Sequence, residues 1–408
     1  MSSEFDQWPI HRRDFLKLMG ISGLSLLLSN CRLSLPEELP PTPTPTIEIL
    51  PSATPTRQPT QAATETSAPT ETPAYQALVS TAKVDRYDLD ILRVEMARML
   101  DNLGGLGEVI KPGARVGIKP NLTAGSWIDG VIPAPATEMY TTHPAVVQVL
   151  AELLIDAGAA KIFIMEGMYD QVTYQRWGYA DAAAAVGAEL IDLNDPAPYS
   201  SFVEFPVGPD FDIYPSFNMN ALLNELDLFV SVAKLKCHTS SGVTLAMKNL
   251  FGIAPMQLYR LKETHTNRSA FHGDANYETR VPRVILDLNR ARPIDLAVID
   301  GIMTVEAAAG PWDDGAAQVK PGVLAAGFDP VATDAVSTAI IGFDPNEKSL
   351  SEPFIYCDNH LALAAEAGLG TNNLAEIGVR GPEIEVLRYP FRPAIRGAVD
   401  RSPFRRHV

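Results

Sequence analysis

The sequence predicts an α/β fold with a mostly parallel sheet and helices on both faces, preceded by a disordered tether. Three observations support this. From about Leu78 onward, short apolar runs alternate with segments whose apolar residues recur at helical spacing. The runs are nearly uninterrupted, as in parallel strands buried on both faces. Before them, ten prolines and ten threonines lie between Pro36 and Gln76, in a segment with too little apolar surface to fold.

Strands and helices alternate along the predicted domain, residues 78–395, with residues 396–408 as a tail. Helices are expected between the strands and after Asp329. Asp329 and Pro330 have the pattern of an N-cap followed by the first helical position. Thr142 is the expected N-cap of the first helix. The expected strands are Ala114–Lys119, Lys161–Glu166, Glu189–Leu193, Asp227–Lys236, Ile294–Asp300 and Val323–Gly327. The expected helices are His143–Ala157, Tyr174–Val186, Val281–Asn289 and the one after Asp329.

Residues 1–30 are expected to be an export signal. The pair Arg12-Arg13 resembles a twin-arginine signal of bacterial export, and the apolar run Leu18–Leu28 is shorter than the roughly 20 residues of a membrane span. The end of this run, up to Cys31, resembles a lipobox in which the cysteine receives a lipid, although Asn30 departs from the usual Gly, Ala or Ser. The alternative is an amphipathic or buried helix that stays attached.

Residues 31–77 are expected to connect Cys31 to the domain as an extended spacer, because proline disfavours helices and sheets. With a lipid on Cys31, the protein would be exported and anchored to the outer face of the cytoplasmic membrane. Its partners there would be the membrane and, earlier, the export machinery. A disordered tail without a role is the alternative.

Charge and cysteine content exclude several classes of function. The net charge of −16 disfavours a nucleic-acid partner. The chain has three cysteines, too few for a Cys₄ zinc site or a cysteine-ligated iron–sulfur cluster, so no such cluster is expected. Cys237 is expected to be a small buried residue, with a reactive thiolate as the alternative, and its pairing with Cys357 stays open.

Polar residues recur where the predicted strands end. Ligands of open parallel sheets bind beyond the carboxyl ends of the strands, so these residues are expected to share one rim. Several of these residues are lysines, although the chain as a whole carries a net negative charge, and they indicate a site for an anion. Gly242–Thr244 is expected to open a helix whose free N–H groups bind that anion, with Lys248 on the same face as Thr244. The alternative is a solvated basic loop followed by an ordinary helix.

Several of these motifs, in this order, resemble the domain-of-unknown-function 362 family over roughly residues 80–345. They are Lys119-Pro120-Asn121, Thr142-His143-Pro144, Lys234-Leu235-Lys236-Cys237-His238, Thr244 to Gly252, Asp300-Gly301 and Asp329 to Asp334. The resemblance implies a shared α/β domain, and His272 matches the family's histidine after the Lys-Asn helix. Some relatives carry an iron–sulfur module, for which this chain lacks the cysteines. Membership does not establish an activity.

The predicted roles follow from residue chemistry. His238 and Lys248, with His143 or His272, are the expected catalytic residues, although His143 is equally explained as a helix cap. A divalent metal, held by Glu166 and Asp300 with a histidine, is chemically reasonable, although no recognised metal motif is present. The polar loop that contains His272 is expected to be a lid or a mobile surface loop. The expected ligand-binding residues are Lys119, Asn121, Lys236, Thr244 and Asn249.

The sequence therefore predicts an exported, membrane-tethered α/β protein that holds an anionic small molecule, with the reaction undetermined. A non-catalytic lipoprotein that binds a solute or cofactor is the first alternative. A structural protein of the cell envelope with a vestigial pocket is the second.

Overall fold

A computed structural model describes residues 75–395 of the chain except 108, 131, 275 and 314. The predictions for the export signal, for Cys31, for nearly all of the spacer and for the tail at 396–408 lie outside the described residues. The described residues belong to one compact unit. None of the helices they form is long and apolar enough to cross a membrane.

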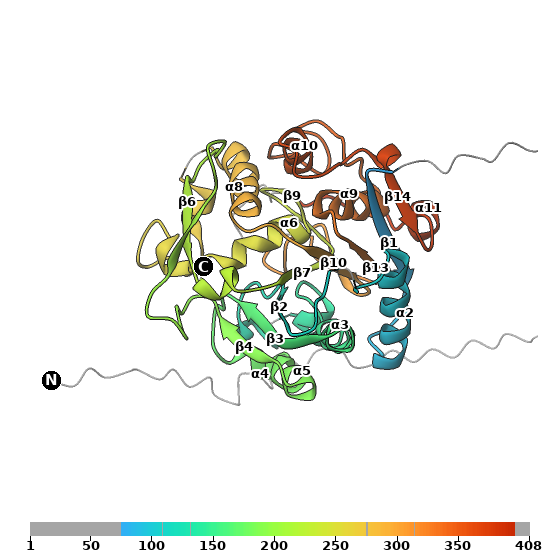
Figure 1. The fold of residues 1–408 in the computed structure, drawn as a ribbon. Helices are drawn as coiled ribbons and strands as arrows, with labels where there is room; N and C mark the ends of the chain where they lie inside the picture. Colours follow the sequence, from blue (N-terminus) through green and yellow to red (C-terminus); the bar gives the residue numbers. More distant parts are fainter. Residues whose placement is uncertain (1–74, 108, 131, 275, 314, 396–408) are drawn as a thin grey trace, which may run out of the picture. The chain divides into compact units, whose positions relative to one another are not determined.

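An eight-stranded sheet forms the centre of the described region, in the order β14-β1-β13-β10-β7-β2-β3-β4 (Figure 1). Neighbouring strands pair in parallel, except that β13 is antiparallel to both β1 and β10. The mostly parallel α/β fold is thus confirmed. The sequence pattern predicts six of these strands and misses β1 and β14. The strands are β1 (Ala77–Lys83), β2 (Ala114–Pro120), β3 (Ala159–Glu166), β4 (Glu189–Asp192), β7 (Leu228–Lys234), β10 (Leu296–Gly301), β13 (Val323–Gly327) and β14 (Ile377–Arg380).

Helices cover both faces of this sheet, because its strands bury apolar side chains on both sides. Val116 and Ile118 of β2 pack with α2, α3 and α5 on one face, whereas Phe163 and Met165 of β3 pack in the core with α6, α8 and α9 on the other. The helices are α2 (Leu89–Asn102), α3 (Pro144–Asp156), α4 (Thr173–Arg176), α5 (Tyr179–Val186), α6 (Ala246–Asn249), α7 (Ser269–His272), α8 (Tyr277–Ala291), α9 (Pro330–Ile340), α10 (His360–Glu366) and α11 (Ile384–Leu387).

Three two-stranded sheets and several short 3₁₀ helices complete the described elements. The paired strands are β5 (Val203–Pro206) with β6 (Ser216–Met219), β8 (Lys236–His238) with β9 (Gly242–Thr244), and β11 (Thr304–Glu306) with β12 (Ala317–Val319). The 3₁₀ helices are Ser126–Ile128, Ala136–Glu138, Ala221–Asn224, Leu250–Ile253, Met256–Leu258 and Leu374–Glu376.

Local details differ from the sequence prediction at two helices. The helix predicted over Tyr174–Val186 is broken into α4 and α5 at Gly178, whose φ of 77° lies in the left-handed region. The N-cap of α3 is His143 rather than Thr142: its Nδ1 accepts a hydrogen bond from the backbone N–H of Ala145 at 3.2 Å. The cap of α9 is as predicted, since the Asp329 carboxylate accepts from the N–H of Ala332 at 2.9 Å.

Candidate functional site

A cavity of about 980 Å³ lies beyond the carboxyl ends of β2 and β3, beside the β8–β9 hairpin and α6. It collects most of the residues that the sequence singles out, although they come from segments far apart in the chain. His143 and Asp300 are not among its lining residues. The predicted residues that do line it are Lys119, Asn121, Glu166, Lys236, His238, Thr244, Lys248, Asn249 and His272.

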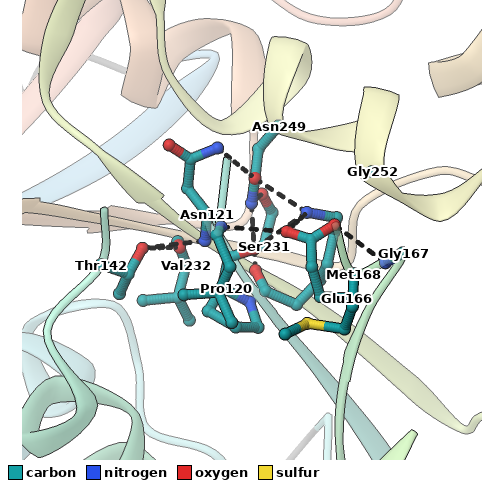
Figure 2. Close-up of polar contacts among 12 residues, drawn as sticks. Pro120, Asn121, Thr142, Glu166, Gly167, Met168, Ser231, Val232, Asn249 and Gly252 are labelled. Carbon is teal, nitrogen blue, oxygen red and sulfur yellow. Dashed lines mark hydrogen bonds and ion pairs between the residues drawn. The ribbon is translucent and has the colours of Figure 1, made fainter. Parts of the chain in front are cut away.

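A buried ion pair lies at the floor of the site. The Nζ of Lys119 is 2.7 Å from Oε2 of Glu166, and both side chains are less than 5% exposed. The carboxylate also accepts from the backbone N–H groups of Leu122 and Gly167, each at 3.0 Å (Figure 2). Burial lowers the pKa of Lys119, and the Glu166 carboxylate opposes that shift. Gly252 is required beside the pair, because an added Cβ would lie 1.9 Å from Oε1 of Glu166.

Two asparagines extend this network toward the cavity. Asn249 accepts at Oδ1 from the Lys119 ammonium at 3.0 Å and from Nδ2 of Asn121 at 3.2 Å (Figure 2). Its own Nδ2 donates to the backbone carbonyl of Lys119 and to the hydroxyl of Ser231. These bonds fix the amide of Asn121, and its Oδ1 is left without a hydrogen-bond partner among the described residues.

Lys236 is a buried lysine at the wall of the cavity. It is 1% exposed, and its Nζ donates to the backbone carbonyl of Tyr140 at 2.7 Å and lies 5.5 Å from the centre of the Tyr140 ring. Burial lowers the pKa of Lys236 well below the usual lysine value, and the positive charges of Lys248 and Lys234 lower it further.

Lys248 projects from α6 and is 8% exposed. Its Nζ lies 4.1 Å from the centre of the Phe251 ring. Burial is the main reason that the pKa of Lys248 falls to about 7, and the positive charges of Lys119 and Arg268 add to the shift. Both charged groups that lower its pKa are cations.

His238 and His272 also line the cavity. Burial first, and then the charge of Lys248, lower the pKa of His272 to about 3 and that of His238 well below its usual value. Both rings are therefore neutral near pH 7. Nδ1 of His238 accepts from the N–H of Ser240 at 3.1 Å, which leaves the ring proton on Nε2.

The predicted anion site at a helix start is wrong. Gly242–Thr244 forms strand β9 rather than a first helical turn, so Thr244 and Lys248 do not share one helix face. The helix α6 begins only at Ala246, and Asp334 occupies its free N–H groups: the carboxylate oxygens accept from Ala246 at 2.8 Å and from Met247 at 3.0 Å.

The predicted metal pair is also wrong. Glu166 ends β3 and Asp300 lies in β10, three strands away, which corresponds to about 14 Å across a sheet. Each carboxylate is paired with a different lysine, Glu166 with Lys119 and Asp300 with Lys234. Among the described residues, no group of three or more His, Cys, Asp or Glu side chains is arranged to hold a metal ion.

Asp300 and His143 belong to a second buried cluster. The Asp300 carboxylate pairs with Lys234 at 2.9 Å, accepts from the Tyr87 hydroxyl at 2.9 Å and accepts from the backbone N–H of His143 at 3.0 Å. The His143 ring stacks on Tyr87 with centroids 3.7 Å apart. This cluster ties the start of α3 to β7 and β10, and it explains His143 as a cap rather than a proton carrier at the cavity.

Sequence reasoning missed several lining residues. Arg268 is 5% exposed and donates to the backbone carbonyls of Ala254 and Gly167. It lies in the loop expected to be a lid, but nothing in the polar sequence around it marks it as buried. The aromatic residues of the lining come from four separate segments: Trp127, Tyr169, Phe251 and Trp312.

The cysteines of the domain are buried and unpaired with each other. Burial raises the pKa of Cys237 to about 12 and that of Cys357 to about 12. Cys237 is therefore the small buried residue expected from the sequence.

The fold and the cavity define an α/β protein with a buried, lysine-rich pocket at the carboxyl ends of parallel strands. The chain belongs to the DUF362 family, a domain of unknown function whose family model matches residues 116–339, more than half of the chain. A thylakoid-associated protein of Synechocystis is 27% identical over 270 residues, which cover 65% of this chain and 75% of that protein. A crystal structure of a Thermotoga maritima protein matches 55% of this chain at 12% identity and a TM-score of 0.31, and the match spans 53% of that chain.

Proposed function

We propose that this protein binds a small organic anion, bearing a carboxylate or phosphate group, in the cavity at the carboxyl ends of β2 and β3. The observation that carries the proposal is the gathering of buried cationic side chains there. Lys236, Lys248 and Arg268 line the cavity in addition to Lys119, which is already paired with Glu166. Burying cationic groups near one another is costly, and a bound anion offsets that cost.

Uncharged polar atoms support the same proposal. Oδ1 of Asn121, Oγ1 of Thr244 and Oδ1 of Asn267 belong to lining residues, are buried and have no hydrogen-bond partner among the described residues. Buried polar atoms are nearly always hydrogen-bonded, so these atoms are available to a ligand. The two amide oxygens accept hydrogen bonds, which favours an anion that also carries a hydroxyl or amine donor.

The size and walls of the cavity favour an organic molecule over a bare inorganic ion. About 980 Å³ lies at the upper end of the roughly 300–1,000 Å³ typical of small-molecule sites. Trp127, Tyr169, Phe251 and Trp312 supply apolar surface for the carbon skeleton of the ligand.

Proton transfer to or from this anion is assigned in the proposal to His238 and His272, which are neutral near pH 7. A lipoprotein that binds a solute without turnover would use the same cavity. Replacing either histidine by alanine separates these cases, because an enzyme would lose turnover and keep most of its affinity, whereas a binding protein shows no turnover to lose.

Calorimetry on the full chain tests the binding proposal, with inorganic phosphate, citrate and 3-phosphoglycerate as probes. Lys236→Met removes one charge-assisted hydrogen bond, which typically contributes about 1.5–3 kcal/mol and thus about 10- to 150-fold in affinity. Lys111→Met, at an exposed lysine that does not line the cavity, should leave the affinity unchanged. Absence of binding for all three probes, or equal affinities of Lys236→Met and the unaltered protein, would contradict the proposal.

Export and lipid anchoring remain part of the proposal. They are supported by Arg12-Arg13, by the short apolar run after it and by Cys31. The printed name of the Synechocystis relative, a thylakoid-associated protein, is consistent with a membrane location. Cys31→Ser should abolish labelling by radioactive palmitate, and Lys-Lys in place of Arg12-Arg13 should retain the protein inside the cell. Labelling and export that persist in these variants would refute this part.

A further inference from the structure

Lys248 differs from the other lysines around the sheet ends in what surrounds its amine. Lys119 contacts Glu166, Asn249 and the Pro120 carbonyl, and Lys234 contacts Asp300, Tyr87 and the Thr137 carbonyl. These contacts favour the ammonium form and direct its N–H groups toward acceptors.

The Nζ of Lys248 instead faces the Phe251 ring and the cavity. The charged groups that shift its pKa, Lys119 and Arg268, are both positive. Desolvation and neighbouring cations both favour the neutral amine, and they are the two features that activate a lysine as a nucleophile. The pKa of about 7 that results leaves a large fraction of the amine unprotonated near neutral pH.

We propose that Lys248 captures a small anionic carbonyl compound, of the 2-oxo acid class, as a covalent imine in this cavity. The inference rests on the proposed anion binding, because Lys236 and Arg268 would hold the carboxylate while the amine reaches the carbonyl carbon. An aldehyde or ketone group beside the negative charge is therefore the chemical feature that distinguishes this ligand from other anions.

The reaction needs no oxidant, reductant or further reactant. The nitrogen lone pair of neutral Lys248 attacks the carbonyl carbon, and the C=O π bond becomes a hydroxyl after a proton moves from nitrogen to oxygen. The C–O bond then breaks, water leaves and the C=N bond forms, so that one amine and one carbonyl give one imine and one water. Both N–H hydrogens of the amine end on the oxygen that leaves as water, so the reaction balances without a further proton donor.

Lys236, the other lysine of the cavity that has no carboxylate hydrogen-bonded to its amine among the described residues, is a weaker candidate. The pKa of Lys236 is lowered even more strongly, but its Nζ donates to the Tyr140 carbonyl and its side chain is only 1% exposed. Imine formation places a carbon substituent on the nitrogen, and this substituent needs room in the cavity. Lys248, which is 8% exposed, is more accessible from the cavity than Lys236.

Reductive trapping tests the inference. The full chain is incubated at pH 7 with glyoxylate, pyruvate or 2-oxoglutarate and sodium cyanoborohydride, and the adduct is located by intact mass and peptide mapping. We expect one adduct per chain at Lys248 with at least one of the three acids. Acetone, a ketone without a charge, should label Lys248 at least tenfold less.

Lys248→Arg is the matched variant, since it keeps a cation and removes the nucleophile. It should form no adduct in the cavity, whereas Lys111→Arg should label like the unaltered protein. Phosphate binding without an adduct at Lys248 from any of the three acids would overturn the imine and leave anion binding intact. Equal labelling of Lys248 and exposed lysines would also overturn it. Absence of both binding and labelling would refute anion binding as well.

Discussion

Glu166→Gln is the substitution whose cost the structure defines most fully. The Glu166 carboxylate makes three contacts: with the Lys119 ammonium at 2.7 Å, with the Leu122 N–H at 3.0 Å and with the Gly167 N–H at 3.0 Å. Glutamine offers one oxygen and one NH₂ group to these three donors, so at least one donor faces another donor. The substitution also leaves the buried Lys119 without its counter-charge.

Removing one partner of a buried ion pair typically costs about 3–5 kcal/mol, and we expect the free energy of unfolding to fall by about this amount at pH 7. The loss should shrink at higher pH. Without Glu166, the pKa of Lys119 in the folded state falls further below its value of about 10.4 in the unfolded chain. At any pH between these two pKa values, the unfolded state binds more protons than the folded state. The stability of Glu166→Gln should therefore rise relative to the unaltered protein as the pH increases through that window.

Urea unfolding of the full chain at pH 7 and pH 9.5 measures both effects. Glu189→Gln is the matched control, because Glu189 pairs with Lys161 at the surface, where both side chains are about half exposed. Exposed pairs contribute about 0–1 kcal/mol, so this control should change little. Combining Glu166→Gln with Lys119→Met should recover part of the loss, since no buried charge is left unpaired. A loss below about 1 kcal/mol at pH 7 would refute the assignment of Lys119 and Glu166 as a buried ion pair.

Three further outcomes are expected. Anion binding favours protonated Lys248, whose pKa is about 7. Binding should therefore take up a proton, and affinity should fall as the pH rises above about 7. Calorimetry in two buffers of different ionisation enthalpy measures the proton uptake. Gly252→Ala should lower stability by about 1–3 kcal/mol in urea unfolding, because its Cβ collides with Glu166, whereas Gly107→Ala, with open space around the new Cβ, should not. His143→Ala should cost about 1 kcal/mol through the lost cap of α3 and leave phosphate affinity unchanged, because His143 does not line the cavity; a tenfold loss of affinity would contradict this.

The sequence predicts the rim of the sheet well and the partners within it poorly. The apolar runs predict Lys119, Glu166 and Asp300 at strand ends, and the structure has them there. Which of them meet depends on side-chain direction. Val230 and Val232 of β7 belong to the core on the α2–α3 face, so Lys234 continues that face and meets Asp300 there.

Ser231 points to the opposite face, where its hydroxyl accepts from Asn249. Lys119 lies opposite Ser231 in the parallel pairing of β2 and β7, and it therefore belongs to the cavity side with Asn249. A one-residue difference in position along a strand thus separates the two buried lysine clusters, and uncertainty of that size in the predicted strand boundaries prevents the sequence from deciding between them.

Apolar periodicity and helix caps are local properties, and from them the sequence predicts the α/β class, six of the eight strands of the central sheet and the residue types at their ends. Three facts are visible only in the folded chain: the Asp300 carboxylate pairs with Lys234, Asp334 accepts from the first N–H groups of α6, and Arg268 and Lys248 line one cavity. These facts depend on strand order and on the packing of segments 20 or more residues apart, which fix the distances between charges. The same packing buries Lys248 near Lys119 and Arg268 and lowers the pKa of its amine to about 7, which no local pattern could indicate.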